Sequence, residues 1–148
     1  RWPDFNDALW KNLLEEAETT KRELPANLIF GSDRDKRAVD LARRNADSAG
    51  IGAKIRWSYN DFAKLEAPAS QGTLICNPPY GERLGNEEEL TAFYRKIGDT
   101  FKQNWKGWTA WVFTGNLALA KQVGLKASRR IVLYNGPIEC RLLKYDLY

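Results

Sequence analysis

A short apolar run, residues 73–76, is followed by Asn77, Pro78, Pro79 and Tyr80. Proline lacks a backbone N–H and has a fixed φ, so the two prolines end the predicted strand and hold the loop rigid. The Asn77 side-chain oxygen and the Pro78 carbonyl then form two acceptors for an exocyclic amino group, and Tyr80 offers a ring on which a base can stack. We therefore interpret these four residues as a catalytic loop. The alternative is a structural turn, which Asn-Pro often begins.

Two other predicted strands end in acidic residues. Residues 27–33 form an apolar run that ends in Gly-Ser-Asp, and Asp33 stands where an acid can accept hydrogen bonds from ribose hydroxyls. Asp33 or Asp35 could instead cap the following helix. Asp61 closes an alternating run, residues 53–61, where an aspartate is either a ligand contact or a turn residue.

Composition excludes several kinds of chemistry. The 148 residues contain no histidine, so neither a Ser-His or Cys-His pair nor a histidine metal site can form. Two cysteines, Cys76 and Cys140, suit a reducing cytoplasm and predict no metal cluster. No apolar run approaches the roughly 20 residues that span a bilayer, so we expect no membrane partner. The net charge of +4 agrees with a polyanionic partner but also with an ordinary basic surface.

Strand and helix patterns alternate along the chain. Helical spacing of apolar residues predicts helices over residues 6–23, 38–49, 86–101 and 117–123, with Asn6 and Asn86 as N-caps. Strands are predicted over residues 27–33, 53–61, 73–76 and 108–116, followed by a hairpin that turns at residues 135–137. This order predicts one α/β domain whose sheet is mostly parallel, with a C-terminal antiparallel hairpin at one edge. Ligands of such sheets bind outside the carboxyl ends of the strands.

Several segments together resemble a known family. The segments "NPPYGERLG", "FTGN" and "LYNGPIECRLLKY" are similar to the bacterial large-subunit (23S) ribosomal RNA guanine-N2 methyltransferases. The segments "RWPDFNDALW", "GSDRD" and "ARRNADSAGI" fit the same pattern, so the resemblance covers essentially all 148 residues. It implies a Rossmann-like class I methyltransferase sheet, S-adenosyl-L-methionine as cofactor and ribosomal RNA as partner.

The resemblance also implies a role for each matching residue. Asp33 would bind the ribose of the cofactor, and Asp61 with Phe62 would contact its adenine side. The loop 77–80 would be catalytic, with Asn77 also on the cofactor side.

The family's first strand, with its glycine-rich loop, and its RNA-binding THUMP domain have no counterpart in this sequence. "GIG" at residues 50–52 cannot replace the loop, because it ends a helix. We therefore expect residues 1–148 to be part of a methyltransferase domain that lacks its first strand, and to be inactive when isolated.

Two alternatives stay open. An N6-adenine DNA methyltransferase shares the tetrapeptide and the same acceptor geometry. A noncatalytic nucleic-acid-binding module could use Arg83, Lys126, Arg129 and Arg130 as phosphate contacts, although such contacts need neither the two prolines nor the tyrosine. The sequence leaves open which nucleotide is modified and what the oligomeric state is.

Overall fold

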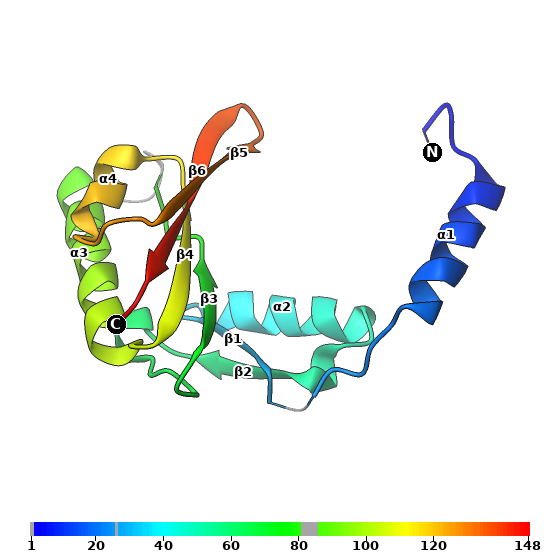
Figure 1. Cartoon of the computed structure of the whole chain (residues 1–148), viewed down its shortest axis with the longest axis horizontal. Helices are drawn as coiled ribbons and strands as arrows, with labels where there is room; N and C mark the ends of the chain where they lie inside the picture. Colours follow the sequence, from blue (N-terminus) through cyan, green and yellow to red (C-terminus); the bar gives the residue numbers. More distant parts are fainter. Residues whose placement is uncertain (1, 26, 81–85) are drawn as a thin grey trace. The chain divides into compact units, whose positions relative to one another are not determined.

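The computed structural model describes residues 2–25, 27–80 and 86–148. The chain forms two units that meet in the sequence between Ser58 and Tyr59. Figure 1 traces the elements of both in sequence order. Each unit is described by itself below. Within the described ranges, no helix combines the length and the apolar character that crossing a lipid bilayer requires.

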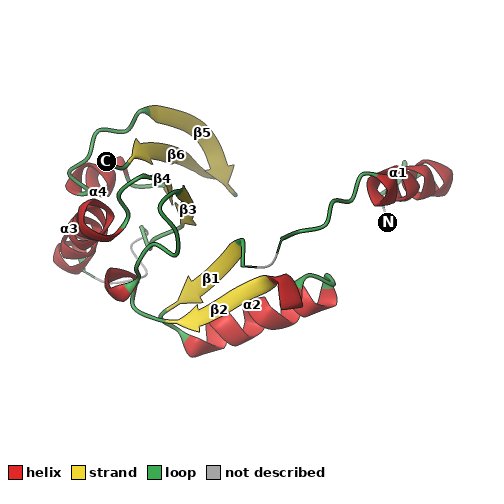
Figure 2. Cartoon of the chain, turned by 60° about the horizontal axis from the view of Figure 1, so that its bottom comes forward, coloured by secondary structure: helices red, strands yellow, loops and turns green. Residues whose placement is uncertain are grey.

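The first unit contains a two-stranded sheet and two helices. Its elements are α1 (Asp7–Thr19), β1 (Ile29–Asp33), α2 (Lys36–Ser48), a 3-10 turn (Gly52–Lys54) and β2 (Ile55–Tyr59). Figure 2 draws β1 and β2 as arrows that point the same way, with α2 alongside them. Gly31 of β1 lies close to the ring of Trp57 on β2. A Cβ atom at position 31 would come within 2.5 Å of that ring, so a larger residue would not fit there. This strand–helix–strand order confirms the predicted crossover.

The helix α1 forms where the sequence predicts it but buries none of its side chains. The Asn6 side chain caps it by accepting a hydrogen bond from Leu9 N at 3.0 Å. It ends at Thr19, four residues before the predicted end at Glu23. The hydroxyls of Thr19 and Thr20 donate back to main-chain carbonyls one turn earlier, a local alternative to continuing the helix.

The second unit contains a four-stranded mixed sheet in the order β3-β4-β6-β5. Its elements are a 3-10 turn (Phe62–Lys64), β3 (Gly72–Cys76), α3 (Glu87–Asn104), β4 (Trp108–Thr114), α4 (Leu117–Gln122), β5 (Arg129–Asn135) and β6 (Ile138–Asp146). Strand β3 is parallel to β4, whereas β6 is antiparallel to both β4 and β5. The predicted C-terminal hairpin is therefore confirmed, and β5 is the sheet edge that it supplies.

The core of the second unit lies between its sheet and α3. Alternate residues of β4, including Ala110 and Val112, are fully buried, which is the pattern of a strand with one face on a core. Helix α3 faces them with Tyr94, Ile97 and Phe101. This core supports the strand ends at which the catalytic loop was predicted.

The predicted single sheet is divided into two. Among the described strands, β1 pairs with β2 alone and β3 pairs with β4 alone. The expected single sheet is therefore not formed by the strands that the structure describes.

Candidate functional site

The predicted catalytic loop begins at the carboxyl end of β3, as expected. Pro78 is buried and anchors the loop, whereas Asn77 next to it is exposed. No other side chain or main-chain group of the described residues forms a hydrogen bond with the Asn77 side chain. Its amide oxygen is therefore available to a ligand.

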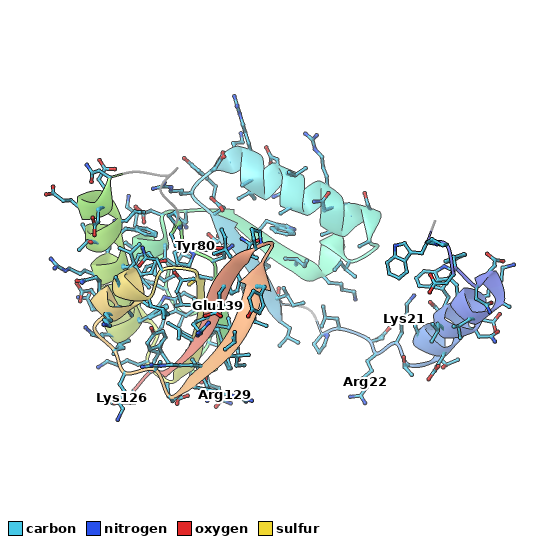
Figure 3. The ribbon with its side chains drawn as sticks, turned by 90° about the horizontal axis from the view of Figure 1, so that it is seen from above. Lys21, Arg22, Tyr80, Lys126, Arg129 and Glu139 are labelled. Carbon is cyan, nitrogen blue, oxygen red and sulfur yellow. The ribbon has the colours of Figure 1, made fainter. Side chains whose placement is uncertain are left out.

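Tyr80, at the other end of the loop, is held by the C-terminal hairpin. Its hydroxyl accepts a hydrogen bond from Asn135 Nδ2 at 2.8 Å, and the Cys140 thiol lies 3.7 Å from the same oxygen. Its half-buried ring stands edge-on to Phe113, with 6.3 Å between the ring centres. Figure 3 shows Tyr80 near the turn of the hairpin. These contacts fix the direction in which the ring points.

The segment "FTGN" shapes the space around Tyr80. Thr114 is buried and hydrogen-bonds with the Tyr94 hydroxyl at 2.9 Å. Gly115 leaves room for the Tyr80 ring, since a Cβ there would come within 2.9 Å of it. Asn116 caps α4 by accepting from Leu119 N at 3.0 Å. Each polar residue of the segment thus has a positioning role.

Two titratable groups close to this loop stay neutral at neutral pH. Burial raises the pKa of the Cys76 thiol to about 12. Burial also raises the pKa of Tyr94 to about 12, against the opposing effect of its hydrogen bond with Thr114. Neither group is therefore an anionic nucleophile, which agrees with chemistry that forms no covalent enzyme intermediate.

Asp61 serves as the cap of the 3-10 turn that contains Phe62. One carboxylate oxygen accepts from Ala63 N at 2.9 Å, and the other lies 3.3 Å from Lys96 Nζ. The Ala63 amide and the Lys96 ammonium lower the pKa of Asp61. Phe62 packs edge-on against Phe101, with 5.7 Å between ring centres. Asp61 is therefore a turn residue, which is one of the two roles that the sequence allows for it. A contact with a ligand would have to be made in addition to this cap.

Asp33 ends β1 with an exposed carboxylate. One oxygen accepts a hydrogen bond from Asp35 N at 2.8 Å, and no other bond to this side chain joins it to the described chain. Asp35 is the residue that caps α2, by accepting from Arg37 N at 2.8 Å. The second oxygen of Asp33 is therefore oriented and available.

The candidate residues fall into two groups. Asn77, Pro78, Pro79 and Tyr80 form one loop of the second unit, which also contains Asp61 and Phe62, whereas Asp33 belongs to the first unit. No hydrogen bond or ring contact within the described chain joins the Asp61 turn to the loop. Arg83 and the rest of the segment 81–85 lie outside the described residues.

Sequence reasoning missed the residues that hold Tyr80. Asn135 and Cys140 lie 55 and 60 positions away from it along the chain. They belong to the hairpin segment quoted for the family resemblance, but that resemblance assigned them no role. Gly115 carried a usable signal, because a glycine directly after a buried strand often marks a close approach.

Proteins named as methyltransferases resemble this chain in sequence. Residues 1–144 match the family described as the RMKL-like methyltransferase domain. A protein of Synechocystis that is named among the RNA methyltransferases is 48% identical over 148 residues, which are the whole of this chain and 38% of that protein. A ribosomal RNA large subunit methyltransferase K/L of Syntrophotalea carbinolica is 42% identical over 99% of this chain and 21% of its own length. The chain thus spans well under half the length of these relatives.

Solved structures show the same fold. SMU.472, classed as a methyltransferase and solved in complex with SAH, superposes with a TM-score of 0.84 at 29% identity over 99% of this chain and 39% of its own. A Listeria monocytogenes protein classed as an N6-adenine-specific DNA methylase superposes with a TM-score of 0.78, also at 29% identity, over 99% of this chain and 37% of its own. The fold is therefore that of a Rossmann-like methyltransferase, and the chain belongs to the RMKL-like methyltransferase domain family.

Proposed function

We propose that the protein containing this chain transfers a methyl group from S-adenosyl-L-methionine to the exocyclic N2 amino group of a guanine in large-subunit ribosomal RNA. The observation that carries the proposal is the loop after β3. Its exposed Asn77 side chain has no hydrogen-bond partner among the described residues, and its tyrosine ring is held in place by the hairpin. The K/L relatives support ribosomal RNA as the substrate.

The residues present fit the proposed cofactor. The Asp33 carboxylate is held by one backbone amide and keeps its second oxygen available, which suits the ribose hydroxyls of an adenosine. Phe62 is fixed by Phe101 and suits the adenine ring. When bound, S-adenosyl-L-methionine supplies an electrophilic methyl group on a sulfonium. The structure of SMU.472 in complex with SAH supports this assignment.

The loop supplies orientation rather than a charged catalyst. The Asn77 side-chain oxygen and the Pro78 carbonyl accept the two protons of the guanine amino group, which directs its lone pair outward. Tyr80 stacks on the base. As the new N–C bond forms and the bond between the methyl group and the sulfonium sulfur breaks, the amino group loses one proton to water. No residue of the loop has to become covalently modified.

We further propose that residues 1–148 form only part of the methyltransferase domain in a longer, cytoplasmic protein. Each of β1 and β3 has one sheet edge without a described partner. Ile75 of β3 is 70% exposed and Phe30 of β1 is 45% exposed, although both lie in apolar strands. A strand from elsewhere in the protein would pair with these edges and would carry the loop that holds the methionine part of the cofactor.

The test is methyl transfer by the full-length protein. Unmodified large-subunit ribosomal RNA would be incubated with the protein and labelled S-adenosyl-L-methionine, and the RNA digested to nucleosides. We expect labelled N2-methylguanosine. Label in another nucleoside, or none in RNA, would overturn the assignment of the substrate atom.

One other target has a specific observation in its favour. The Listeria monocytogenes relative is classed as an N6-adenine-specific DNA methylase, and an adenine amino group fits the same two acceptors. Unmethylated duplex DNA in a parallel reaction would distinguish the two, because N6-methyladenine would then be the labelled product.

A further inference from the structure

The segment from residue 100 to residue 138 concentrates positive charge. It contains no aspartate or glutamate, although the whole chain has 19 acidic residues against 23 basic ones. It contains six cationic side chains: Lys102, Lys106, Lys121, Lys126, Arg129 and Arg130. The structure forms β4, α4 and β5 from this segment. Several of these cations therefore lie on neighbouring elements of the second unit.

Three of these cations line a groove between α4 and the hairpin. The groove has a volume of about 190 Å³ and is lined by Lys121, Lys126 and Arg130, together with Arg141 of β6. Figure 3 shows Lys126 pointing outward from the second unit on the same side as Arg129. The buried side chains of Leu143 and Tyr145 also line the groove.

The sheet register places the two arginines on the groove face. Arg130 lies opposite Leu143 in the β5–β6 ladder, and Arg141 follows Leu143 at an interval of two residues along β6. Residues opposite each other, or two apart in one strand, share a sheet face. That face also carries Tyr145, so backbone geometry brings the cations and the buried floor together.

Most of this positive charge is uncompensated. Within the described chain, Lys121, Lys126 and Arg130 form no ion pair. Arg141 is paired, with one guanidinium nitrogen 2.7 Å from Glu139 and another donating to the Cys140 carbonyl at 3.0 Å. The groove thus offers three exposed cations.

The tyrosine that lines the groove, Tyr145, is neutral. Burial raises the pKa of Tyr145, although the nearby positive charge of Arg130 acts in the opposite direction. The hydroxyl therefore keeps its proton at neutral pH and adds no negative charge to the groove.

We infer that this groove binds the phosphodiester backbone of the RNA strand that carries the modified base. The inference rests on the proposed RNA substrate and adds a second contact surface to it. The three exposed cations are hydrogen-bond donors, as phosphate oxygens require. The volume is below the roughly 300 Å³ of typical small-molecule pockets, so the groove suits a phosphate of a strand that runs across it better than an enclosed nucleotide.

The experiment measures RNA binding by the full-length protein. Fluorescence anisotropy would follow a labelled single-stranded oligoribonucleotide at several salt concentrations, with the wild type, K121Q/K126Q and K126Q/R130Q. All three side chains are exposed, so we expect the variants to fold and to bind S-adenosyl-L-methionine normally. K106Q removes a cation of the same segment that does not line the groove.

The affinity for a single strand falls with salt, and each phosphate contact adds about 0.7 to the steepness of log affinity against log salt. Each double variant removes two contacts, so we expect it to reduce this steepness by about 1.4 and to weaken the affinity in 0.1 M salt by about 25-fold. K106Q should stay within about twofold of the wild type, because a cation outside the groove makes no phosphate contact. Wild-type affinity and slope in both double variants would overturn the inference. So would binding of polyglutamate as tight as that of the oligoribonucleotide, which would indicate an acidic protein partner.

Methyl transfer measured in parallel separates this inference from the proposed function. If the wild type methylates ribosomal RNA while the double variants bind RNA normally, the groove assignment fails and the function stands. If the wild type binds RNA through the groove but transfers no methyl group to it, the proposed function fails and the groove stands.

Discussion

At the scale of single residues, the candidate site depends on side chains that are held by neighbours rather than on charged catalysts. Tyr80 is fixed by Asn135 and Phe113, and Asp33 by a backbone amide. Among the described residues Asn77 has no such partner, which leaves its side chain available to a substrate. Such an arrangement catalyses by orientation, and its loss should therefore appear in turnover before it appears in stability.

Replacing Asn77 with alanine in the full-length enzyme should reduce single-turnover methyl transfer about 100-fold or more, as expected when a positioned polar group is lost from an active site. Asn77→Asp keeps an acceptor oxygen and should retain more activity than Asn77→Ala. Asn45→Ala, on the exposed side of α2, is the matched control and should be silent. Near-normal rates in Asn77→Ala would mean that the loop is only a structural turn.

The hydrogen bond between Tyr80 and Asn135 should behave as one interaction. Tyr80→Phe and Asn135→Ala each remove it and should each cost about 1 kcal/mol of transition-state stabilisation, a several-fold loss in rate. The double variant should then be no worse than either single variant, since both changes delete the same contact. Tyr80→Ala also removes the stacking ring and should cost about 1 to 3 kcal/mol more. Additive losses in the double variant would show that Asn135 acts independently of Tyr80.

Asp61 should make stability depend on acid. Its pKa is lowered in the folded chain, so its contribution is fully present above its ordinary value of 3.8 and is lost as the pH falls through the lowered pKa. Because the Asp61 side chain is 44% exposed, we expect less than about 1 kcal/mol. Denaturation midpoints measured from pH 6 to pH 2 should fall less steeply for Asp61→Asn than for the wild type. Parallel curves would contradict this role.

At the scale of elements, the second unit depends on the close approach of α3 and α4. Gly98 of α3 faces the backbone of Val123, whose carbonyl oxygen would lie 1.8 Å from a Cβ at that position. Helix α4 in turn borders the cationic groove. The packing of these two helices therefore supports both the core and the proposed RNA contact.

Gly98→Ala should destabilise the protein by about 1 to 3 kcal/mol, the usual range for overpacking, even though alanine is the better helix former by about 1 kcal/mol. The measurement is the shift of the chemical denaturation midpoint. Ala92→Gly, at an exposed position of α3, is the control and should cost only the propensity difference of about 1 kcal/mol. An unchanged or higher midpoint in Gly98→Ala would mean that α4 moves away without cost.

At the scale of the whole molecule, the exposed edges of the two sheets bear on whether residues 1–148 can bind the cofactor by themselves. Strands β1 and β3 belong to separate sheets, and each exposes apolar side chains. The helix α1 likewise leaves its apolar residues Leu9 and Leu13 about half exposed. This exposure of apolar side chains supports our proposal that residues 1–148 form only part of a methyltransferase domain.

Isolated residues 1–148 should bind S-adenosyl-L-methionine far more weakly than the full-length protein does. Asp33 and Asp61 are kept, but the strand that we propose to pair with β1 and β3 is not, and neither is the loop that would hold the methionine part of the cofactor. Calorimetric titration of both proteins is the measurement. Equal affinities would show that no further strand is needed for the cofactor site.

Local features could be read directly from the sequence. Apolar spacing located the helices and strands, and Asn6 and Asn86 cap helices as predicted. The Gly136-Pro137 turn formed the expected hairpin, with Asn135 opposite Ile138. These features depend on contacts within a few residues, so neighbouring side chains alone specify them.

Tertiary structure alone decided how the site is held. The bond between Tyr80 and Asn135 joins residues 55 positions apart, and the contact of Gly98 with Val123 joins two helices. Neither pair has a periodic or local signature, because each depends on where the sheet order β3-β4-β6-β5 brings distant segments together. The sequence by itself therefore determined the catalytic loop as a candidate, whereas long-range packing determined the direction of its tyrosine.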